Sequence, residues 1–168
     1  NLELIIVNDG TSPIPPHPDL RVRVLDNRQR GAVPARNMGV VSAAGRRIAF
    51  LDDDDWWVDE RHLALSLSAA APFTFTDGEF IFMDGSPPVE FAFGATAETL
   101  AMDNTILISG VCYEKSLHDN LGLFDEALPY YWDWDWYLRV ARSGAMLRRI
   151  AVATVCIRVH AENMSGDQ

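Results

Sequence analysis

The sequence predicts an α/β fold in which helices flank a mixed, mostly parallel sheet. Short apolar runs typical of buried strands alternate with longer segments of helical character, and turn residues close each run. Such alternation is typical of parallel strands that are linked by helices. With 168 residues, the chain fits a single domain (1–168). A chain of this size buries roughly 70% of its unfolded surface, which is enough for a real core.

Residues 1–70 give the order strand, loop, strand, helix, strand, helix. We expect strands at residues 2–7, 21–25 and 46–51, and helices at residues 33–44 and 59–70. The segment from Asn8 to Ser12 supplies the turn after the first strand, and a proline-rich loop follows it. Gly45 is the expected C-cap of the first helix, because glycine readily adopts the backbone conformation that ends helices.

The remaining residues change to shorter, β-prone runs. Asp77-Gly78 and Asp84-Gly85 separate aromatic runs between residues 73 and 93, and Asp-Gly in this setting indicates hairpin turns. Beyond them we expect a short helix at 95–102, a strand at 105–113, helices at 114–121 and 132–143, and one or two strands within 146–159. Gly144 is the expected end of the last helix.

The composition excludes several classes of protein. The chain has 14 Lys and Arg against 24 Asp and Glu, a net charge of −10. Nucleic-acid grooves need surplus positive charge, so no nucleic-acid partner is expected. No run approaches the roughly 18 apolar residues of a membrane span, so we expect no transmembrane segment and a cytoplasmic location. Cys112 and Cys156 lie in apolar segments and are expected to be buried thiols rather than a disulfide.

Four successive aspartates, Asp52 to Asp55, follow the apolar run of residues 48–51. Carboxylates this close repel one another unless they are solvated or share a cation. A site made only of oxygen donors suits Mg or Mn better than Zn. On an extended segment, Asp52 and Asp54 point to one side, and Asp53 and Asp55 point to the other. The alternative is a solvated loop, or a cap for the helix that follows.

Five segments stand out by their order and spacing along almost the whole chain. They are residues 4–12 (LIIVNDGTS), 35–39 (ARNMG), 48–56 (IAFLDDDDW), 124–128 (FDEAL) with 132–139 (WDWDWYLR), and 158–165 (RVHAENMS). Together they resemble the inverting glycosyltransferases of family two, which have the Rossmann-like GT-A fold of nucleotide-diphospho-sugar transferases. The resemblance implies metal-dependent, inverting transfer of a sugar to a hydroxyl acceptor, in the synthesis of polysaccharides or glycoconjugates. It also implies Mn or Mg as cofactor and, by the family's common default, a UDP-sugar as donor.

The same resemblance assigns site residues. Those that it places beside the nucleotide and its diphosphate are Asp9, Gly10, Arg36, Asn37, Asp52 and Asp54. It places Asp52 at the ribose and Asp54 at the metal, with Asp52 and His160 as further metal-site residues. From the residues alone, each role has a structural alternative: an Asx-turn at Asp9, a surface helix position for Arg36, and a structural histidine at 160.

The resemblance further implies a single general base that takes the proton of the acceptor hydroxyl. Asp133 matches the aspartate of the family's Glu-Asp motif, although Trp132 stands where the family has Glu. Asp135 is the second candidate, but its spacing from Arg139 favours an ion pair on the helix surface. The helical spacing of the tryptophans favours core packing for at least one stripe over stacking on a sugar.

One departure from the family concerns the sheet. Family members normally begin with a strand and a helix before the segment that starts here at residue 2, and that strand lies inside the sheet. We therefore expect a truncated piece, or exposed strand edges that pair with another chain in a homo-oligomer. Residues 1–70 would form the nucleotide-binding part and residues 71–168 the acceptor side.

Two other functions stay open at this point. One is a non-catalytic module that binds a nucleotide sugar or a glycan, which the missing strand and Trp132 make plausible. The other is an aspartate-nucleophile phosphatase, which needs a suitably placed lysine, whereas Lys115 is the only lysine of the chain.

Overall fold

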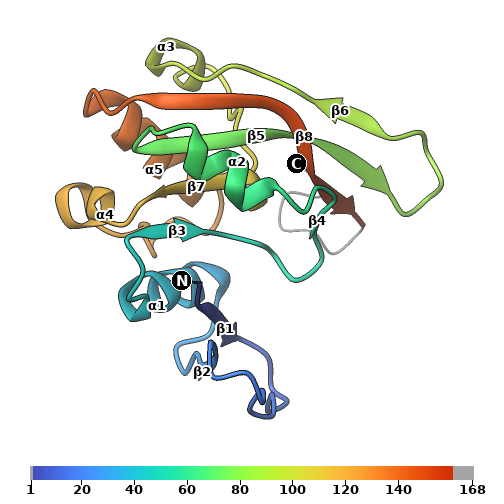
Figure 1. The fold of residues 1–168 in the computed structure, drawn as a ribbon, viewed down its shortest axis with the longest axis vertical. Helices are drawn as coiled ribbons and strands as arrows, with labels where there is room; N and C mark the ends of the chain where they lie inside the picture. The colour runs from blue at the N-terminus through green and yellow to red at the C-terminus, as the bar shows by residue number, and fades with distance from the viewer. Residues whose placement is uncertain (1, 161–168) are drawn as a thin grey trace.

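The computed structural model describes residues 2–160, which form two groups of strands with helices packed around them (Figure 1). The strands are β1 (Leu4–Asn8), β2 (Val22–Asp26), β3 (Arg47–Ala49), β4 (Trp56–Trp57), β5 (Phe73–Phe82), β6 (Val89–Phe91), β7 (Val111–Glu114) and β8 (Leu147–Val159). The helices are α1 (Ala32–Ser42), α2 (His62–Ser68), α3 (Ala97–Leu100), α4 (Ser116–Leu121) and α5 (Trp132–Arg142), with a 3-10 helix η1 (Ile108–Gly110). None of the helices described is long and apolar enough to cross a bilayer, and a cytoplasmic location stays a prediction.

The strands form two separate sheets. β1 and β2 pair in parallel, and the other strands follow the order β3-β7-β5-β8-β4, with β6 beside β5. In this larger sheet β5 and β8 run parallel, whereas the pairs β3–β7, β5–β7, β4–β8 and β5–β6 are antiparallel. The α/β fold with a mixed sheet is thus confirmed, but parallel pairing does not predominate. Pairing direction depends on contacts between distant segments, which the local apolar pattern does not encode.

The hairpin turn expected at Asp77-Gly78 is wrong, because both residues lie inside β5. The register between β5 and β8 shifts at this point, and such a bulge bends a strand without ending it. The Asp77 carboxylate accepts two hydrogen bonds from the Arg149 guanidinium, at 2.7 and 2.8 Å. Gly78 has no room for a side chain, since a Cβ would lie 2.7 Å from Leu107 Cδ1 and 2.8 Å from the Val155 carbonyl oxygen. Gly78 is therefore required by close packing and not by a turn.

Of the three other glycines expected at turns or helix ends, two fit the structure and one does not. Asp84-Gly85 does form the turn between β5 and β6, and Gly85 has a φ of 85°. Gly144 follows the end of α5 with a φ of 81°, as expected. Gly45 does not cap α1, because the helix already ends at Ser42 and Ala43 is its C-cap.

Aromatic residues of β5, β7 and α5 form the centre of the core. Trp136 is fully buried, and its ring centroid lies 4.6 Å from that of Tyr113 and 4.3 Å from that of His118. Phe73 stacks on Tyr113 with 5.5 Å between the ring centroids. Trp132 and Trp136 are both buried, so this stripe of α5 packs in the core, as predicted.

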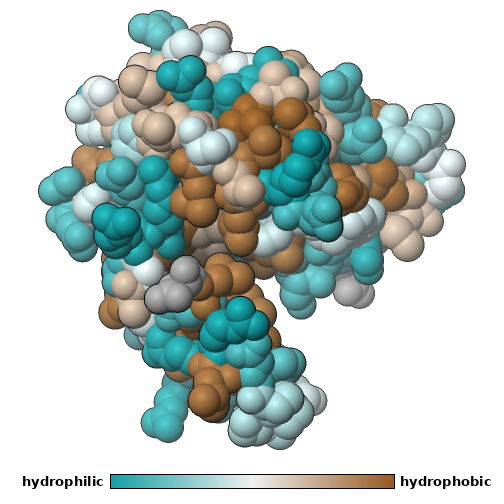
Figure 2. Space-filling view, in the orientation of Figure 1, coloured by the Kyte–Doolittle hydropathy of each residue, from teal (hydrophilic) through white to brown (hydrophobic). Residues whose placement is uncertain are grey.

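Strands β1 and β3 each keep an open edge. Within residues 2–160, β1 pairs with β2 and β3 pairs with β7, and neither has a partner on its other side. The apolar Leu4 of β1 is 53% exposed, and Figure 2 shows apolar surface on the part of the molecule that contains β1 and β2. The exposed edges expected from the sequence are therefore present. Their pairing with another chain stays a prediction.

The packing around Gly78 gives a first prediction. Gly78→Ala should lower the free energy of unfolding by about 1–3 kcal/mol, because the new methyl group overlaps side-chain and backbone atoms of a filled core. Urea unfolding monitored by tryptophan fluorescence measures this change. Gly94→Ala is the matched control, since nothing lies within 4 Å of a Cβ there, and it should change stability by no more than about 0.5 kcal/mol. Equal stability of the two variants would contradict the strand assignment of Gly78.

Candidate functional site

The four aspartates after β3 form a tight turn and not an extended segment. The Asp55 amide donates to the Asp52 carbonyl oxygen at 3.1 Å, so the chain reverses between them. One carboxylate oxygen from each of Asp52, Asp54 and Asp55 lies within 4.8 Å of the other two, whereas Asp53 is exposed. The expectation that Asp55 points away with Asp53 is therefore wrong, because it assumed the alternation of a strand. We call residues 52–55 the acid turn.

Asp55 is fixed by two hydrogen bonds from distant segments. Its Oδ2 accepts from the Ser109 hydroxyl at 2.6 Å, and its Oδ1 accepts from the Arg158 amide at 3.1 Å. Burial raises the pKa of Asp55 to about 6, and repulsion from Asp52 and Asp54 adds to the rise. Asp55 thus belongs to the carboxylate cluster and does not cap the helix that follows.

Arg36 joins the acid turn to the start of α5. On α1, its guanidinium forms an ion pair with the Asp52 carboxylate. The guanidinium carbon lies 4.5 Å from the centroid of the Trp132 ring, and Nη1 donates to the Ala32 carbonyl oxygen at 3.2 Å. Burial raises the pKa of Asp52, while the charge of Arg36 opposes that rise. Arg36 is consequently a part of the site and not a surface residue of the helix.

Asp133 lies in the first turn of α5, directly after Trp132. Its carboxylate accepts a hydrogen bond from Asn104 Nδ2 at 3.1 Å. Burial raises the pKa of Asp133, and a backbone hydrogen bond, the Asn104 bond and the charge of Arg36 act in the opposite direction. Because Arg36 contacts both Asp52 and the Trp132 ring, the start of α5, which carries Asp133, lies next to the acid turn. Trp132 is 5% exposed, so it supports Arg36 from the core and has little surface to offer a sugar.

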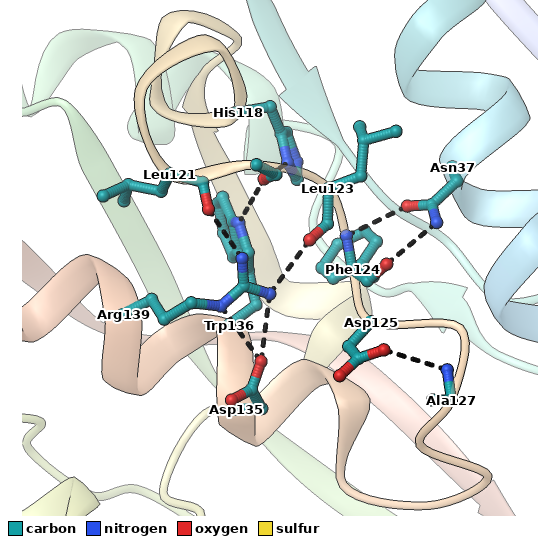
Figure 3. A network of polar contacts seen from close by, with 11 residues as sticks. Asn37, His118, Leu121, Leu123, Phe124, Asp125, Ala127, Asp135, Trp136 and Arg139 are labelled. Carbon is teal, nitrogen blue, oxygen red and sulfur yellow. Dashed lines mark hydrogen bonds and ion pairs between the residues drawn. The ribbon is translucent and has the colours of Figure 1, made fainter.

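Asp135 forms the ion pair that its spacing predicts. Arg139 Nε donates to Asp135 Oδ2 at 3.0 Å, and the two other guanidinium nitrogens donate to the carbonyl oxygens of Leu121 and Leu123 at 2.7 and 2.9 Å (Figure 3). Asp135 therefore helps Arg139 to fix the loop between α4 and α5. This use leaves Asp133 as the stronger candidate for the base.

Asn37 fixes the same loop from the opposite side. Its Nδ2 donates to the Phe124 carbonyl oxygen at 3.0 Å, and its Oδ1 accepts from the Phe124 amide at 3.0 Å (Figure 3). The same Nδ2 also donates to Glu126 Oε1 at 2.9 Å. The side chain is also buried. Both amide hydrogens of Asn37 are used within the protein, and the nucleotide contact expected for Asn37 stays a prediction. Asn37 connects α1 to residues 124–126.

Asp9 and its neighbours shape the end of β1. Asp9 accepts from Asn27 Nδ2 at 2.8 Å and from the Gly31 amide at 2.9 Å, so it links β1 to the start of α1. The Asx-turn lies at Asn8, whose Oδ1 accepts from the Gly10 amide at 3.1 Å, and not at Asp9. A cavity of about 340 Å³ opens here, lined by Asn8, Gly10, Thr11, Pro13, Asp26, Asn27, Arg28 and Arg30. Gly10 thus lines the cavity directly. Asp9 does not line it, but accepts a hydrogen bond from Asn27, which does.

His160 lies at the edge of the acid turn. Its Nε2 is 3.0 Å from Asp54 Oδ2, which brings a nitrogen donor next to the carboxylates as the sequence suggested. The remainder of that motif, residues 161–165, lies outside the described residues.

Sequence reasoning missed three residues of this region, namely Asp55, Asn104 and Ser109. Ser109 is fully buried and contacts both ends of the acid turn. Its signal in the sequence was a lone hydroxyl in the apolar run Ile106 to Val111, where a buried polar group requires a partner. The identity of that partner depends on a contact across 54 positions of the chain.

Comparisons with known proteins find similarity to glycosyltransferases. Residues 1–71 match the model described as Glycosyl transferase family 2. The uncharacterized glycosyltransferase YwdF of Bacillus subtilis is 33% identical over 178 positions, which cover 98% of this chain and 65% of that relative. WfaP of Escherichia coli, named as a UDP-Glc:alpha-D-GlcNAc-diphosphoundecaprenol beta-1,3-glucosyltransferase, is 27% identical and covers 100% of this chain and 70% of the relative.

Solved structures show the same fold. S. aureus TarS in complex with UDP-GlcNAc superimposes with a TM-score of 0.73 at 18% sequence identity. The match covers 99% of this chain and 52% of the TarS chain. A likeness at this identity concerns the fold alone.

The acid turn predicts a stability that depends on pH. Asp55 has its pKa raised from 3.8 to about 6, so between these values the folded state holds more protons than the unfolded state, and stability falls as pH rises through this window. Asp55→Asn removes that loss. Its Oδ1 can still accept from the Arg158 amide, while its Nδ2 would donate to Ser109 Oγ in place of accepting from it. Above pH 7 the variant should be about 1 kcal/mol more stable after allowance for partial exposure, roughly 2–4 °C in Tm. The gain should vanish below the unfolded value of 3.8.

Calorimetry across this pH range measures the difference between the variant and the wild type. His62, whose pKa burial lowers to about 4, affects both proteins alike, so the difference isolates Asp55. Asp53→Asn is the matched control, because Asp53 is exposed and stands outside the cluster. A gain for Asp55→Asn that is the same at every pH would contradict the raised pKa.

Proposed function

Because this chain belongs to Glycosyl transferase family 2 and has its GT-A fold, we propose that it transfers a sugar from a nucleotide diphosphate sugar to a hydroxyl acceptor with inversion. The proposal includes a Mg or Mn ion as cofactor. Residues 1–70 would bind the nucleotide, and residues 71–168 would form the acceptor side.

The observation that carries this proposal is that Arg36 joins the acid turn to the start of α5. It pairs with Asp52 of the acid turn and lies over the ring of Trp132, the residue that precedes Asp133 in α5. A donor diphosphate at the acid turn would thus lie near both the cation of Arg36 and the carboxylate of Asp133. Sugar transfer needs this combination, because negative charge develops on the leaving group while a proton leaves the acceptor.

The acid turn fits a divalent ion. Asp52, Asp54 and Asp55 offer oxygen donors within 4.8 Å of one another, and Mg and Mn prefer such donors. When bound, the ion would neutralise the charge of the leaving diphosphate. His160 would contribute to the metal site beside Asp54, since its Nε2 lies 3.0 Å from Asp54 Oδ2. Asp52 at the ribose and His160 at the metal or diphosphate remain parts of this proposal.

Asp133 is proposed as the general base. Its pKa is raised by burial, and a carboxylate with a raised pKa accepts a proton more readily. The acceptor oxygen would bond to the anomeric carbon from the face opposite the diphosphate, as the bond from that carbon to the diphosphate oxygen breaks. The proton of the acceptor passes to Asp133, and the bonding electron pair leaves with the nucleotide diphosphate.

The nucleoside is proposed to occupy the cavity at the end of β1. Arg28 and Arg30 in its lining add positive charge, and Gly10 brings the backbone to its surface. Asp9 would set the shape of the cavity through its bond to Asn27. The TarS structures hold UDP and UDP-GlcNAc, which supports a UDP-sugar as donor.

The acceptor is proposed to be a sugar hydroxyl of a polysaccharide or glycoconjugate precursor. WfaP is named for transfer to a diphosphoundecaprenol-linked GlcNAc, which supports an acceptor of this chemical class. The alternative is a module that binds a nucleotide sugar or a glycan without turnover. The two differ in whether the Asp133 carboxylate is required for anything beyond binding.

Donor binding predicts a thermal shift that requires two components. A UDP-sugar together with Mn²⁺ should raise the Tm, because a ligand present at 100 times its Kd stabilises the folded state by about 2.7 kcal/mol. Differential scanning fluorimetry with a panel of nucleotide sugars, each with and without Mn²⁺, measures this. The shift should be largest for one donor and should shrink when EDTA removes the metal. No shift with any nucleotide sugar would contradict donor binding by this chain.

Loss of the base separates the enzyme from the binding module. Asp133→Asn should lower turnover roughly 100-fold or more, since a positioned general base contributes that much. The donor-dependent thermal shift should remain. Release of UDP in the presence of acceptor measures turnover, and Asp135→Asn, which lies two residues further along the same helix, should stay within a few-fold of the wild type. If Asp133→Asn turns over like the wild type, Asp133 is not the base.

A further inference from the structure

Ser109 lies behind the acid turn and contacts both of its ends. Its Oγ donates to Asp55 Oδ2 at 2.6 Å and accepts from the Asp52 amide at 3.1 Å. The residue is 0% exposed, so water does not compete for either bond. We propose that Ser109 is a positioning residue that sets the geometry of the acid turn for a divalent ion, an inference that rests on the proposed function.

A hydroxyl group suits this position for a physical reason. The acid turn collects carboxylates whose mutual repulsion favours an open loop, although Arg36 pairs with Asp52 and His160 lies beside Asp54. The single hydroxyl hydrogen can point at Asp55 while a lone pair of the same oxygen receives the Asp52 amide. One atom thereby fixes both the direction of a carboxylate and the backbone that carries another.

The backbone of Ser109 is itself held by Trp57. Its carbonyl oxygen accepts from Trp57 Nε1 at 2.8 Å. The Trp57 ring stacks on His62 with 4.4 Å between the centroids and 20° between the planes. His62 Nδ1 in turn lies 2.7 Å from Thr154 Oγ1 in β8. The hydroxyl of Ser109 is therefore presented by a rigid part of the fold.

Ser66 provides a comparison within the same molecule. It is also 0% exposed, but its hydroxyl has no hydrogen-bond partner among the described residues. Removal of a buried hydroxyl without a partner leaves no unpaired group behind, so Ser66→Ala controls for the loss of a buried oxygen atom as such. Ser109→Ala, by contrast, leaves the Asp52 amide and one Asp55 oxygen without their shared partner.

The test measures binding of Mn²⁺ by the full chain in the presence of UDP. The free-ion signal in electron paramagnetic resonance gives the Mn²⁺ affinity directly, without any need for turnover. Ser109→Ala should weaken Mn²⁺ binding about 10–100-fold, the usual effect of losing a group that orients a metal ligand. Ser66→Ala should bind Mn²⁺ like the wild type. The Tm without metal, measured for both variants, shows that each is folded.

Each outcome decides the question. Wild-type affinity in Ser109→Ala overturns the inference, as do equal losses in the two serine variants. If the wild type itself binds no Mn²⁺ with UDP, the proposed metal site fails and this inference fails with it. If Ser109→Ala does not fold, Trp57→Phe replaces it, because this change removes the bond to the Ser109 carbonyl while keeping a ring against His62. Unaltered Mn²⁺ affinity in Trp57→Phe then overturns the inference.

Discussion

The arrangement of the site depends on one partly buried cation, the guanidinium of Arg36. It pairs with Asp52 and lies against the Trp132 ring, so it joins the loop after β3 to the first turn of α5. A charge in this position needs compensation, and the protein supplies it with a carboxylate on one side and an aromatic face on the other. Without this cation, Asp52 would lose the charge that opposes the effect of its burial. The proposed donor site and the proposed base are therefore coupled through a single side chain.

Much of the fold could be predicted from the sequence, because local patterns report local structure. Residues 132–143 show apolar residues at helical spacing with glycine beyond them, and α5 follows these bounds closely. Asp77-Gly78 shows the limit of such reasoning. The pair has the composition of a turn, yet contacts with Arg149 and Leu107 place it inside a strand. Tertiary contacts that lie far away in the sequence decided both this case and the direction of strand pairing.

The candidate site was predictable in its residue types more than in its contacts. The acid turn and Asp133 were identified by motif, and Arg36 joins the acid turn to Trp132 at the start of the helix that carries Asp133. The place of Asp55 in the carboxylate cluster could not be predicted, because four aspartates in a row do not reveal whether the backbone is extended or turned. The position of Asn37 in a motif predicted a contact with the nucleotide. In the structure its side-chain amide forms hydrogen bonds with the backbone of Phe124. Only three-dimensional neighbours distinguish these uses.

The adjacency of Arg36 and Asn37 on α1 limits how the length of this chain can vary. One residue reaches toward the loop after β3 and the other toward the loop before α5. Insertion of a single residue earlier in the helix would turn both side chains by roughly 100° and detach them from their loops together. At the tip of the β5–β6 hairpin, Gly85 and Ser86 form hydrogen bonds that are local to the turn, to Phe82 and Asp84. Relatives are therefore expected to differ in length at that tip and to keep α1 at constant length.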